Sequence, residues 1–414
     1  MIKMEFTEEQ KFILEQYKEG KNIFITGPGG VGKSELVKTL YEMKKSVVTA
    51  TTGCAAIRLN CDARTIHSWS GIGLGTKSID EIIRKMHPLV KSEWKTTKVL
   101  IIDEVSMLSM KLFDMLNEIG KRLRRNDLPF GGIQIIFLGD FFQLPPVGDT
   151  PDTQAFCFES LDWNDVFDIQ IELTKIFRQK DEYAKILTQI RRGVIKKSAD
   201  KILRSRVGLI YKGAIMPTKL YPTRMRVDEM NRKSMMMLEG DPVVFEMKAI
   251  MRINGRDMEI EYENIKKGLL VEPELVLKVG AQVMCVVNIK NEKTLELCNG
   301  SQGIVTGFAD GLPIVQFQNG IHRPIGPHIW ESERIPNVGI SQIPLILAWA
   351  ISIHKSQGST LDLAEIDIGS GIFECGQSYV ALSRVKSLEG LYLSSYDPGK
   401  IQINKKVKEF YEKF

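Results

Sequence analysis

Short runs of apolar residues alternate with helical patterns along the first half of the chain. Four of these runs are apolar throughout and end in small or polar residues; they begin at Asn22, Ser46, Lys98 and Ile133. Continuous apolar runs of this length are typical of strands that are buried on both faces of a parallel sheet. The first half therefore predicts a doubly wound α/β domain, with its chemistry at the carboxyl ends of the strands.

A helix is expected directly after the third of these runs. Apolar residues recur at helical spacing from Val105 to Leu123, and the segment ends in a basic run that starts at Lys121. Positive charge favours the C-terminal end of a helix because it offsets the helix dipole.

The second half of the chain repeats the α/β pattern and interrupts it. Strand-like runs begin at Leu220, Leu345, Glu365 and Leu391. Between residues 235 and 344 the pattern changes to short strands separated by glycine turns, as in AQVMCVVNI and QGIVTGF. Short strands of this kind indicate a small β-barrel inserted into a second α/β domain.

The composition excludes several classes of protein. The 414 residues exceed what one hydrophobic core usually serves, and no stretch approaches the roughly 20 apolar residues of a membrane span. The N-terminal residues lack the apolar core of a signal peptide, so we expect an intracellular protein, cytoplasmic or nuclear. Six scattered cysteines form no CxxC pair, which argues against a zinc site and a disulfide framework. The net charge of +5 permits a polyanionic partner without requiring one.

The segment GPGGVGKS fits the phosphate-loop pattern G-x-x-x-x-G-K-S and lies between a predicted strand and a predicted helix. Its glycines let backbone N–H groups close around phosphate oxygens, Lys33 neutralises the terminal phosphates, and Ser34 can hold magnesium. The alternative, a glycine-rich turn that arose by chance, is disfavoured by this context. The expected nucleotide contacts of the loop are Gly27, Gly29, Gly30, Val31, Gly32, Lys33 and Ser34.

Carboxylates follow two of the predicted strands. Asp103 is placed to hold magnesium, and Glu104 to orient or deprotonate the attacking water. The alternative for this pair is a role in capping the following helix. Within GDFFQLPP, Asp140 and Gln143 are candidates for sensing the γ-phosphate, whereas the prolines and phenylalanines favour a rigid structural turn.

Hydrolysis also needs a cation near the transferring phosphoryl group, commonly an arginine that reaches in from a neighbouring domain. Arg178 and Arg384 are the candidates, and the alternative for each is an ordinary surface or salt-bridged side chain. Gln10 is a candidate for reading adenine, although Thr7 to Gln10 is also a capping box that any helix start would use. Both interpretations of Gln10 stay open.

With these residues in place, the chain resembles the Pif-one family of DNA helicases, on the RecD-like side of superfamily 1, along nearly its whole length. The stretch from Lys111 through PFGGIQIIFLGDFFQLPPV is similar to the signature that separates this family from other RecA-like motors. The other motifs that carry the resemblance are TATTGCAAIRL, TIHSWSGIG, LYPTR, AWAISIHKSQGSTLD and YVALSRV.

The resemblance implies a 5′ to 3′ DNA helicase that uses ATP and magnesium and releases ADP and phosphate. Its fold would be two RecA-like doubly wound domains, with a small wedge insertion at about 60–78 in the first. The first domain is expected over 1–175 and the second over 176–234 and 345–414, with the barrel at 235–344.

The resemblance also assigns single residues to DNA and nucleotide. Hydroxyls and short cations suit contacts to phosphates, and Trp69 could stack on a base. For His67 and His354 the alternative is a structural histidine, and Trp69 stands where the family more often has phenylalanine. Gly358 is expected at the nucleotide. The expected DNA contacts are Thr51, Gly53, Thr65, His67, Ser68, Trp69, Thr223, His354, Lys355, Ser356 and Gln357.

Two other classes of protein remain as alternatives. A phosphate-loop kinase for a small molecule is disfavoured by the HKSQG motif and by the arginine of the second domain. A non-catalytic binding module or clamp-loader-like switch would not need the full set of acidic, sensor and arginine residues. The expected partners are single-stranded and forked duplex DNA, with G-quadruplexes and RNA:DNA hybrids left open, no membrane, and a motor that acts as a monomer.

Overall fold

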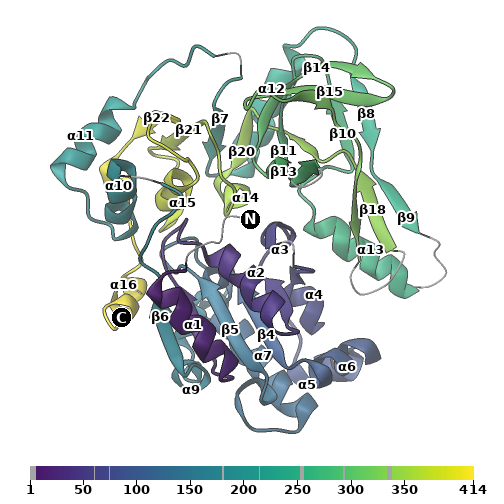
Figure 1. Ribbon diagram of the computed structural model, residues 1–414, viewed down its shortest axis with the longest axis vertical. Coiled ribbons are helices and arrows are strands. Elements are labelled where there is room, and N and C mark those ends of the chain that lie inside the picture. The colour runs from purple at the N-terminus through teal and green to yellow at the C-terminus, as the bar shows by residue number, and fades with distance from the viewer. Residues whose placement is uncertain are drawn as a thin grey trace. The chain divides into compact units, whose positions relative to one another are not determined.

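A computed structural model describes residues 6–59, 61–73, 75–179, 181–213, 215–251, 256–291, 294–332 and 338–414 (Figure 1). The chain divides into two compact units. Unit 1 comprises Met1–Val194 and Gln402–Phe414, and unit 2 comprises Ile195–Ile401.

Unit 1 is built on a six-stranded sheet in the order β3-β2-β4-β5-β1-β6, in which every pair of neighbouring strands is parallel. Their bounds are β1 (Ile23–Thr26), β2 (Val47–Ala50), β3 (Arg64–Thr65), β4 (Val99–Asp103), β5 (Gln134–Gly139) and β6 (Ile169–Glu172). The four strands expected from the apolar runs are therefore confirmed as β1, β2, β4 and β5.

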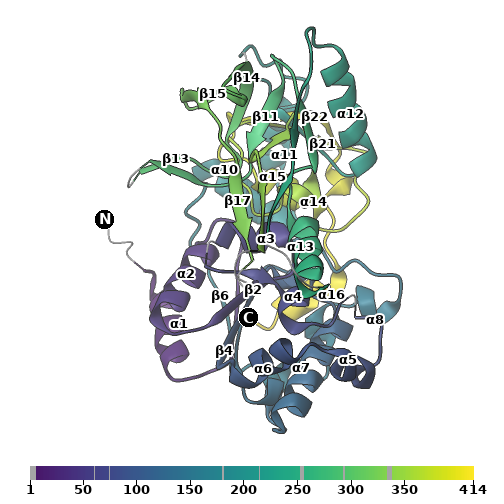
Figure 2. The same cartoon turned by 90° about the vertical axis from the view of Figure 1, so that its right-hand side faces the viewer.

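Helices cover both faces of this sheet (Figure 2). One hydrophobic cluster joins the strands to α1 (Glu8–Lys18), α2 (Lys33–Met43) and α3 (Gly53–Leu59). A second, rich in aromatic rings, joins the opposite face to most of the remaining helices. All the remaining helices of unit 1, whether or not they contribute to this cluster, are α4 (Ile66–Ser70), α5 (Ile79–Lys85), α6 (Pro88–Thr96), α7 (Met110–Arg124), α8 (Pro151–Gln154), α9 (Trp163–Val166), α10 (Asp181–Arg191) and α16 (Lys405–Tyr411).

The helix after the third predicted strand begins later than its pattern indicated. Residues Val105–Met107 form a 3-10 turn, and α7 starts only at Met110. The preceding residue, Ser109, caps the helix because its hydroxyl accepts a hydrogen bond from the N–H of Leu112 at 3.3 Å. The short turn separates the acidic end of β4 from the helix, so the carboxylates are not helix caps.

Unit 2 contains a second parallel sheet, of four strands in the order β20-β7-β21-β22. The strands are β7 (Thr218–Tyr221), β20 (Ala350–Ser352), β21 (Ala364–Ile368) and β22 (Leu391–Tyr396). Its helices are α11 (Lys197–Ser205), α12 (Arg224–Met236), α14 (Ile353–Ser356) and α15 (Gln377–Ser383). The prediction of two parallel α/β sheets is confirmed.

Helix α12, helix α13 and a series of antiparallel strands separate β7 from β20 in the chain. The largest antiparallel sheet has the order β16-β15-β14-β11-β19, and the described strands of this region pair in four separate sheets. The predicted closure into one barrel stays a prediction. The elements are β8 (Val243–Glu246), β9 (Lys248–Met251), α13 (Arg256–Gly268), β10 (Glu274–Leu277), β11 (Gln282–Cys285), β12 (Ile289–Asn291), β13 (Thr294–Leu297), β14 (Gln302–Ala309), β15 (Leu312–Phe317), β16 (His322–Pro324), β17 (His328–Glu331), β18 (Val338–Gln342) and β19 (Leu345–Leu347).

The borders of unit 1 differ from those expected for the first domain. Unit 1 continues beyond residue 175 through α10, because Arg191 on this helix forms ion pairs with Asp140 and Glu172. The last helix, α16, also belongs to unit 1, since Phe410 and Tyr411 are part of its hydrophobic core. Across the parts of the chain that are described, no helix has the length and apolar character needed to cross a bilayer.

Candidate nucleotide and nucleic-acid site

The phosphate loop connects β1 to α2 in unit 1, as its sequence context predicted. Gly30 adopts a left-handed φ of 88°, and a β-carbon there would lie 2.5 Å from the β-carbon of Arg178, so only glycine fits. Among the described residues, no side chain caps the N-terminus of α2, whose N-cap is Gly32. Uncapped N–H groups at a helix start attract phosphate.

Lys33 is the first residue of α2 and its ammonium group closes back on the loop. Nζ donates hydrogen bonds to the carbonyl oxygens of Gly27 at 2.6 Å and Pro28 at 3.1 Å. Burial lowers the pKa of Lys33, and the carboxylates of Asp140, Glu104 and Asp103 oppose that shift. Three acidic residues therefore lie near this lysine. Ser34, the next residue, is exposed.

The acidic pair lies at the carboxyl end of β4. Asp103 is 5% exposed, and its Oδ1 accepts a hydrogen bond from the N–H of Glu104 at 2.9 Å. Burial, followed by the charge of Glu104, raises the pKa of Asp103 to about 7. A cation at this position would stabilise the ionised form of the Asp103 carboxyl group. Oxygen donors such as those of Asp103 and Ser34 therefore fit a hard divalent ion.

Glu104 stands in a backbone conformation that non-glycine residues seldom adopt. Its φ is 56° and its ψ is 41°, in the left-handed region. Its carboxylate pairs with Arg58 of α3 at 3.6 Å. Strained positions of this kind are maintained where the surroundings determine them strongly, and they concentrate at active sites.

Asp140 follows β5 and is held by an arginine that the sequence did not single out. Arg191 donates from Nε to both carboxylate oxygens, at 3.1 and 3.0 Å, and from Nη2 to Oδ1 at 2.9 Å. Its Nη1 donates to Glu172 at 2.6 Å. Asp140 is thus fixed in orientation, and its charge is balanced by a buried partner.

Gln143 and Gln10 both carry buried amide groups. Gln143 is 5% exposed, and its Oε1 has no hydrogen-bond partner among the described residues. A buried acceptor of this kind needs a donor such as water. Gln10 completes the expected capping box with Thr7, while its Nε2 donates to the carbonyl of Val31 at 3.5 Å. The capping interpretation of Gln10 is confirmed, and contact with adenine stays a prediction.

The two candidate arginines lie in different units. Arg178 belongs to unit 1, and its N–H donates to the carbonyl of Gly30 at 3.3 Å. The expectation that Arg178 reaches the loop from the second domain is therefore wrong, because its segment packs on the loop from within unit 1. Arg384 lies in unit 2, where it donates to the carbonyl of Val380 at 2.9 Å and to Ser383 Oγ at 2.7 Å. Its role at the phosphoryl group stays a prediction.

The expected DNA segments of unit 1 meet at one edge of its sheet. Ala50 pairs with Thr65 across β2 and β3, so the residues that follow these strands, Thr51 to Gly53 and Ile66 to Ser68, start side by side. The hydroxyl of Thr51 donates to the carbonyl of Glu104 at 2.9 Å. Thr65 caps α4 by accepting from the N–H of Ser68 at 3.1 Å. His67 is half-buried, which lowers its pKa.

The side chain of Trp69, which was expected to stack on a DNA base, lies inside unit 1. Its side chain is 0% exposed and its ring centroid lies 4.4 Å from that of Trp94. Base stacking by Trp69 is therefore wrong for this structure, because the ring offers no free face. It lies on the inward side of the short helix α4, which the sequence motif alone could not reveal.

Unit 2 holds the other expected DNA residues, most of them on or next to α14. Lys355 is exposed and His354 is half-buried, and burial lowers the pKa of His354. Ser356 is 0% exposed and donates to the carbonyl of Ile353, and Gln357 is 6% exposed. Direct contact of the Ser356 side chain with DNA is therefore wrong for this structure, whereas contact of Gln357 with DNA stays a prediction. Thr223 is exposed at the start of α12, and Gly358 has a left-handed φ of 75°.

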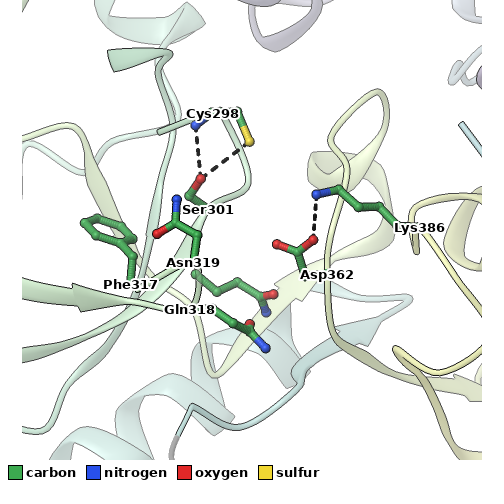
Figure 3. Close-up of a pocket in the computed structure, with 8 residues that line it drawn as sticks. Cys298, Ser301, Phe317, Gln318, Asn319, Asp362 and Lys386 are labelled. Carbon is green, nitrogen blue, oxygen red and sulfur yellow. Dashed lines mark hydrogen bonds and ion pairs between the residues drawn. The ribbon is translucent and has the colours of Figure 1, made fainter. Parts of the chain in front are cut away.

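A pocket of ≈ 140 Å³ lies elsewhere in unit 2 (Figure 3). Cys298 and Ser301 line it from one side, and the ion pair between Lys386 and Asp362, 2.6 Å long, lines it from the other. None of the residues predicted for nucleotide or DNA lines this pocket, so it is separate from the candidate site.

Sequence reasoning missed several residues that complete the site. Arg191 resembles an ordinary cation of an amphipathic helix, and Tyr411 an aromatic residue near the end of the chain, so no local signal marks either of them. Arg58 lies within the motif TATTGCAAIRL, but the motif did not assign it a role. Its pairing with Glu104 became visible only in the structure.

Comparison with known proteins agrees with this geometry. The family model described as PIF1-like helicase matches residues 5–212, and the model for the 2B domain of DNA helicase Pif1 matches residues 261–308. The chain is 36% identical to the ATP-dependent DNA helicase RRM3 of Saccharomyces cerevisiae, over 98% of this chain and 67% of that protein. It spans between 56% and 67% of the length of eight curated relatives.

Solved structures show the same similarity. The Pif1 helicase of Candida albicans matches with a TM-score of 0.78 and 36% identity, over 99% of each chain. Pif1 helicase from Bacteroides in complex with ADP-AlF3 and single-stranded DNA matches with a TM-score of 0.70 and 29% identity, over 99% of this chain and 97% of that one. With a family model over half its length and relatives of this identity, the chain belongs to the Pif1 family of helicases, as its motifs indicated.

Proposed function

We propose that the chain is an ATP-dependent DNA helicase that moves 5′ to 3′ along single-stranded DNA and hydrolyses ATP to ADP and phosphate. One observation carries the proposal. Thr51 begins an expected DNA segment, and its hydroxyl is bonded to the carbonyl of Glu104, the candidate catalytic base. A change at the DNA segment would thus act directly on the residue that orients the attacking water.

The nucleotide chemistry would be divided among the residues at the edge of the unit 1 sheet. Ser34 and Asp103 would hold magnesium, which supplies charge neutralisation at the phosphates when it is bound. Lys33 would bind the β- and γ-phosphates, and Glu104 would accept a proton from the attacking water. Asp140 would keep Arg191 in place, and Oε1 of Gln143, which has no partner among the described residues, would accept a hydrogen bond from a water near the γ-phosphate.

DNA as the partner is supported by the Bacteroides relative, which was solved with single-stranded DNA and a nucleotide analogue. Hydroxyls and cations in the DNA segments would hold the phosphates without reading sequence. Forked duplexes with a free strand are the substrates we propose, for a monomer acting inside the cell. The direction of travel rests on the family resemblance.

A strand-displacement assay tests this function. The substrates are duplexes that carry a single-stranded tail at either a 5′ or a 3′ end, incubated with ATP and magnesium. We expect unwinding of the 5′-tailed duplex and little of the 3′-tailed one, and no unwinding by the Lys33→Ala protein. The reverse preference would overturn the direction, and equal unwinding by Lys33→Ala would overturn the nucleotide site.

The same assay extends to the substrates left open. A quadruplex or an RNA:DNA hybrid placed behind a 5′ tail should be disrupted if the motor tracks only the tail strand. Resistance of both would restrict the proposed substrate to duplex DNA.

A further inference from the structure

The end of the chain reaches the nucleotide site of unit 1. Helix α16 lies with the unit 1 elements although it is last in sequence (Figure 1). Val407, Phe410 and Tyr411 are buried in the aromatic cluster on one face of the sheet. The ring of Phe410 lies 5.4 Å from that of Phe141, beside Asp140.

The hydroxyl of Tyr411 bridges two segments of the candidate site. It shares a short hydrogen bond with the hydroxyl of Thr26, the last residue of β1 before the phosphate loop. It also accepts a hydrogen bond at 3.2 Å from the N–H of Phe141, the residue after Asp140. A single phenol oxygen therefore joins the start of the loop to the end of β5.

The same ring helps to hold the partner of Asp140. The guanidinium of Arg191 lies 5.2 Å from the ring centroid of Tyr411 and 4.7 Å from that of Phe142, and these two rings are stacked. Cations are stabilised at such distances from aromatic rings, most strongly where water is excluded. Burial and the charge of Asp140 raise the pKa of Tyr411, so the hydroxyl stays protonated.

We propose that Tyr411 is a positioning residue for ATP hydrolysis, which sets the spacing between the phosphate loop and Asp140. The inference rests on the proposed function, since it concerns the same nucleotide site. Tyr411 would act through Thr26 and through the Arg191–Asp140 pair, without touching the nucleotide itself. Small displacements of reacting groups lower turnover strongly, while the ground-state affinity for substrate changes little.

The test compares Tyr411→Phe with a matched variant, Tyr17→Phe. Tyr17 is also buried in unit 1, and its hydroxyl donates to the carbonyl of Leu40 at 3.1 Å, near the far end of α2. Both substitutions should lower the unfolding temperature, Tyr411→Phe the more, because the Tyr411 hydroxyl has two hydrogen-bond partners and the Tyr17 hydroxyl one. We expect kcat to fall roughly tenfold in Tyr411→Phe alone, with KM for ATP nearly unchanged.

A coupled pair of variants adds a second measurement. If Tyr411 acts through Thr26, then Thr26→Val combined with Tyr411→Phe should be no slower than the slower single variant. Equal kcat values for Tyr411→Phe and Tyr17→Phe would overturn the inference, and so would independent, multiplying losses in the double variant.

The proposed function is judged separately, by the unmodified protein. If the unmodified protein does not hydrolyse ATP, that result contradicts the proposed function. The role of Tyr411 is then tested by measuring nucleotide affinity. The probe is ADP with and without aluminium fluoride. The gain is the difference in affinity between ADP with aluminium fluoride and ADP alone. We expect Tyr411→Phe to lose this gain and Tyr17→Phe to keep it. An unchanged gain in Tyr411→Phe would overturn the role of Tyr411.

Discussion

Trp69 and Glu104 show how the surroundings of a residue determine its role. Both lie within or beside motifs that resemble those of a DNA motor, but one is enclosed in a core and the other stands at the carboxyl end of β4. Trp69 packs against Trp94 and has no exposed surface. Glu104 keeps its carboxylate near Arg58 in a left-handed backbone conformation.

Substitution of Trp69 should affect stability more than DNA binding. Trp69→Ala should cost about 3–5 kcal/mol of unfolding free energy, because it leaves a cavity in the aromatic cluster. Trp69→Phe should cost less and keep the affinity for single-stranded DNA. Denaturant unfolding and the anisotropy of a labelled oligonucleotide measure the two effects. A roughly tenfold loss of DNA affinity in Trp69→Phe would instead support base stacking.

Substitution of Glu104 should affect turnover and leave ATP binding intact. Glu104→Gln preserves the shape of the side chain but cannot accept the proton of the attacking water, so kcat should fall by about 100-fold or more. The matched control is Glu93→Gln, which removes a carboxylate paired with Arg64 at 2.9 Å in the same unit. Steady-state ATPase rates and nucleotide binding check both, and normal turnover in Glu104→Gln would remove Glu104 as the base.

At the scale of elements, the basic end of α7 does more than offset the helix dipole. Arg124 donates to the carbonyl of Gly131 at 2.6 Å and to three carbonyls at the end of α6, including those of Trp94 at 2.8 Å and Thr97 at 3.0 Å. Arg122, half a turn away, is exposed and pairs with Asp80 and Glu118. The sequence shows one basic run, whereas the fold separates a structural arginine from a surface one.

These two arginines form a matched test. Arg124→Ala should lower the unfolding free energy by about 1–2 kcal/mol, because several partly buried carbonyl groups lose a charged hydrogen-bond donor. The loss is limited to this range because water can reach the site and replace part of the interaction. Arg122→Ala should leave the unfolding midpoint unchanged, since an exposed ion pair contributes little. Urea unfolding of both variants provides the measurement. Equal midpoints would contradict the structural role of Arg124.

At the scale of the whole molecule, each unit has its own parallel sheet and its own expected DNA segments. One exposed cation of these segments in unit 2 is Lys355, on α14. The net charge of +5 is small for a chain of this length, so affinity for DNA should depend on local contacts rather than on the overall charge.

Salt dependence tests this local contribution. The affinity for single-stranded DNA should fall linearly with the logarithm of salt concentration, and Lys355→Ala should reduce that slope by about 1. Lys233→Ala is the control, because this exposed lysine of α12 is paired with Glu229 at 2.6 Å. An affinity that does not vary with salt would contradict contacts to DNA phosphates, and an equal effect of Lys233→Ala would contradict the assignment to Lys355.

Local pattern was sufficient for much of this protein. Apolar runs located β1, β2, β4 and β5, because a buried parallel strand needs an uninterrupted apolar segment. The phosphate loop and the acidic pair were found from residue type and spacing, and both lie at the carboxyl edge of one sheet. The ordered motifs indicated the family, which the relatives confirm.

Only the tertiary structure decided which side chains meet. Arg191 pairs with Asp140 across 51 positions of the chain, and Tyr411 reaches Thr26 across 385. It also turned Trp69 inward and brought Arg178 onto the phosphate loop from within the same unit. Periodicity and spacing describe a chain over a few turns, whereas burial and ion pairing depend on distant segments that folding brings together, and these contacts orient the residues that the motifs provide.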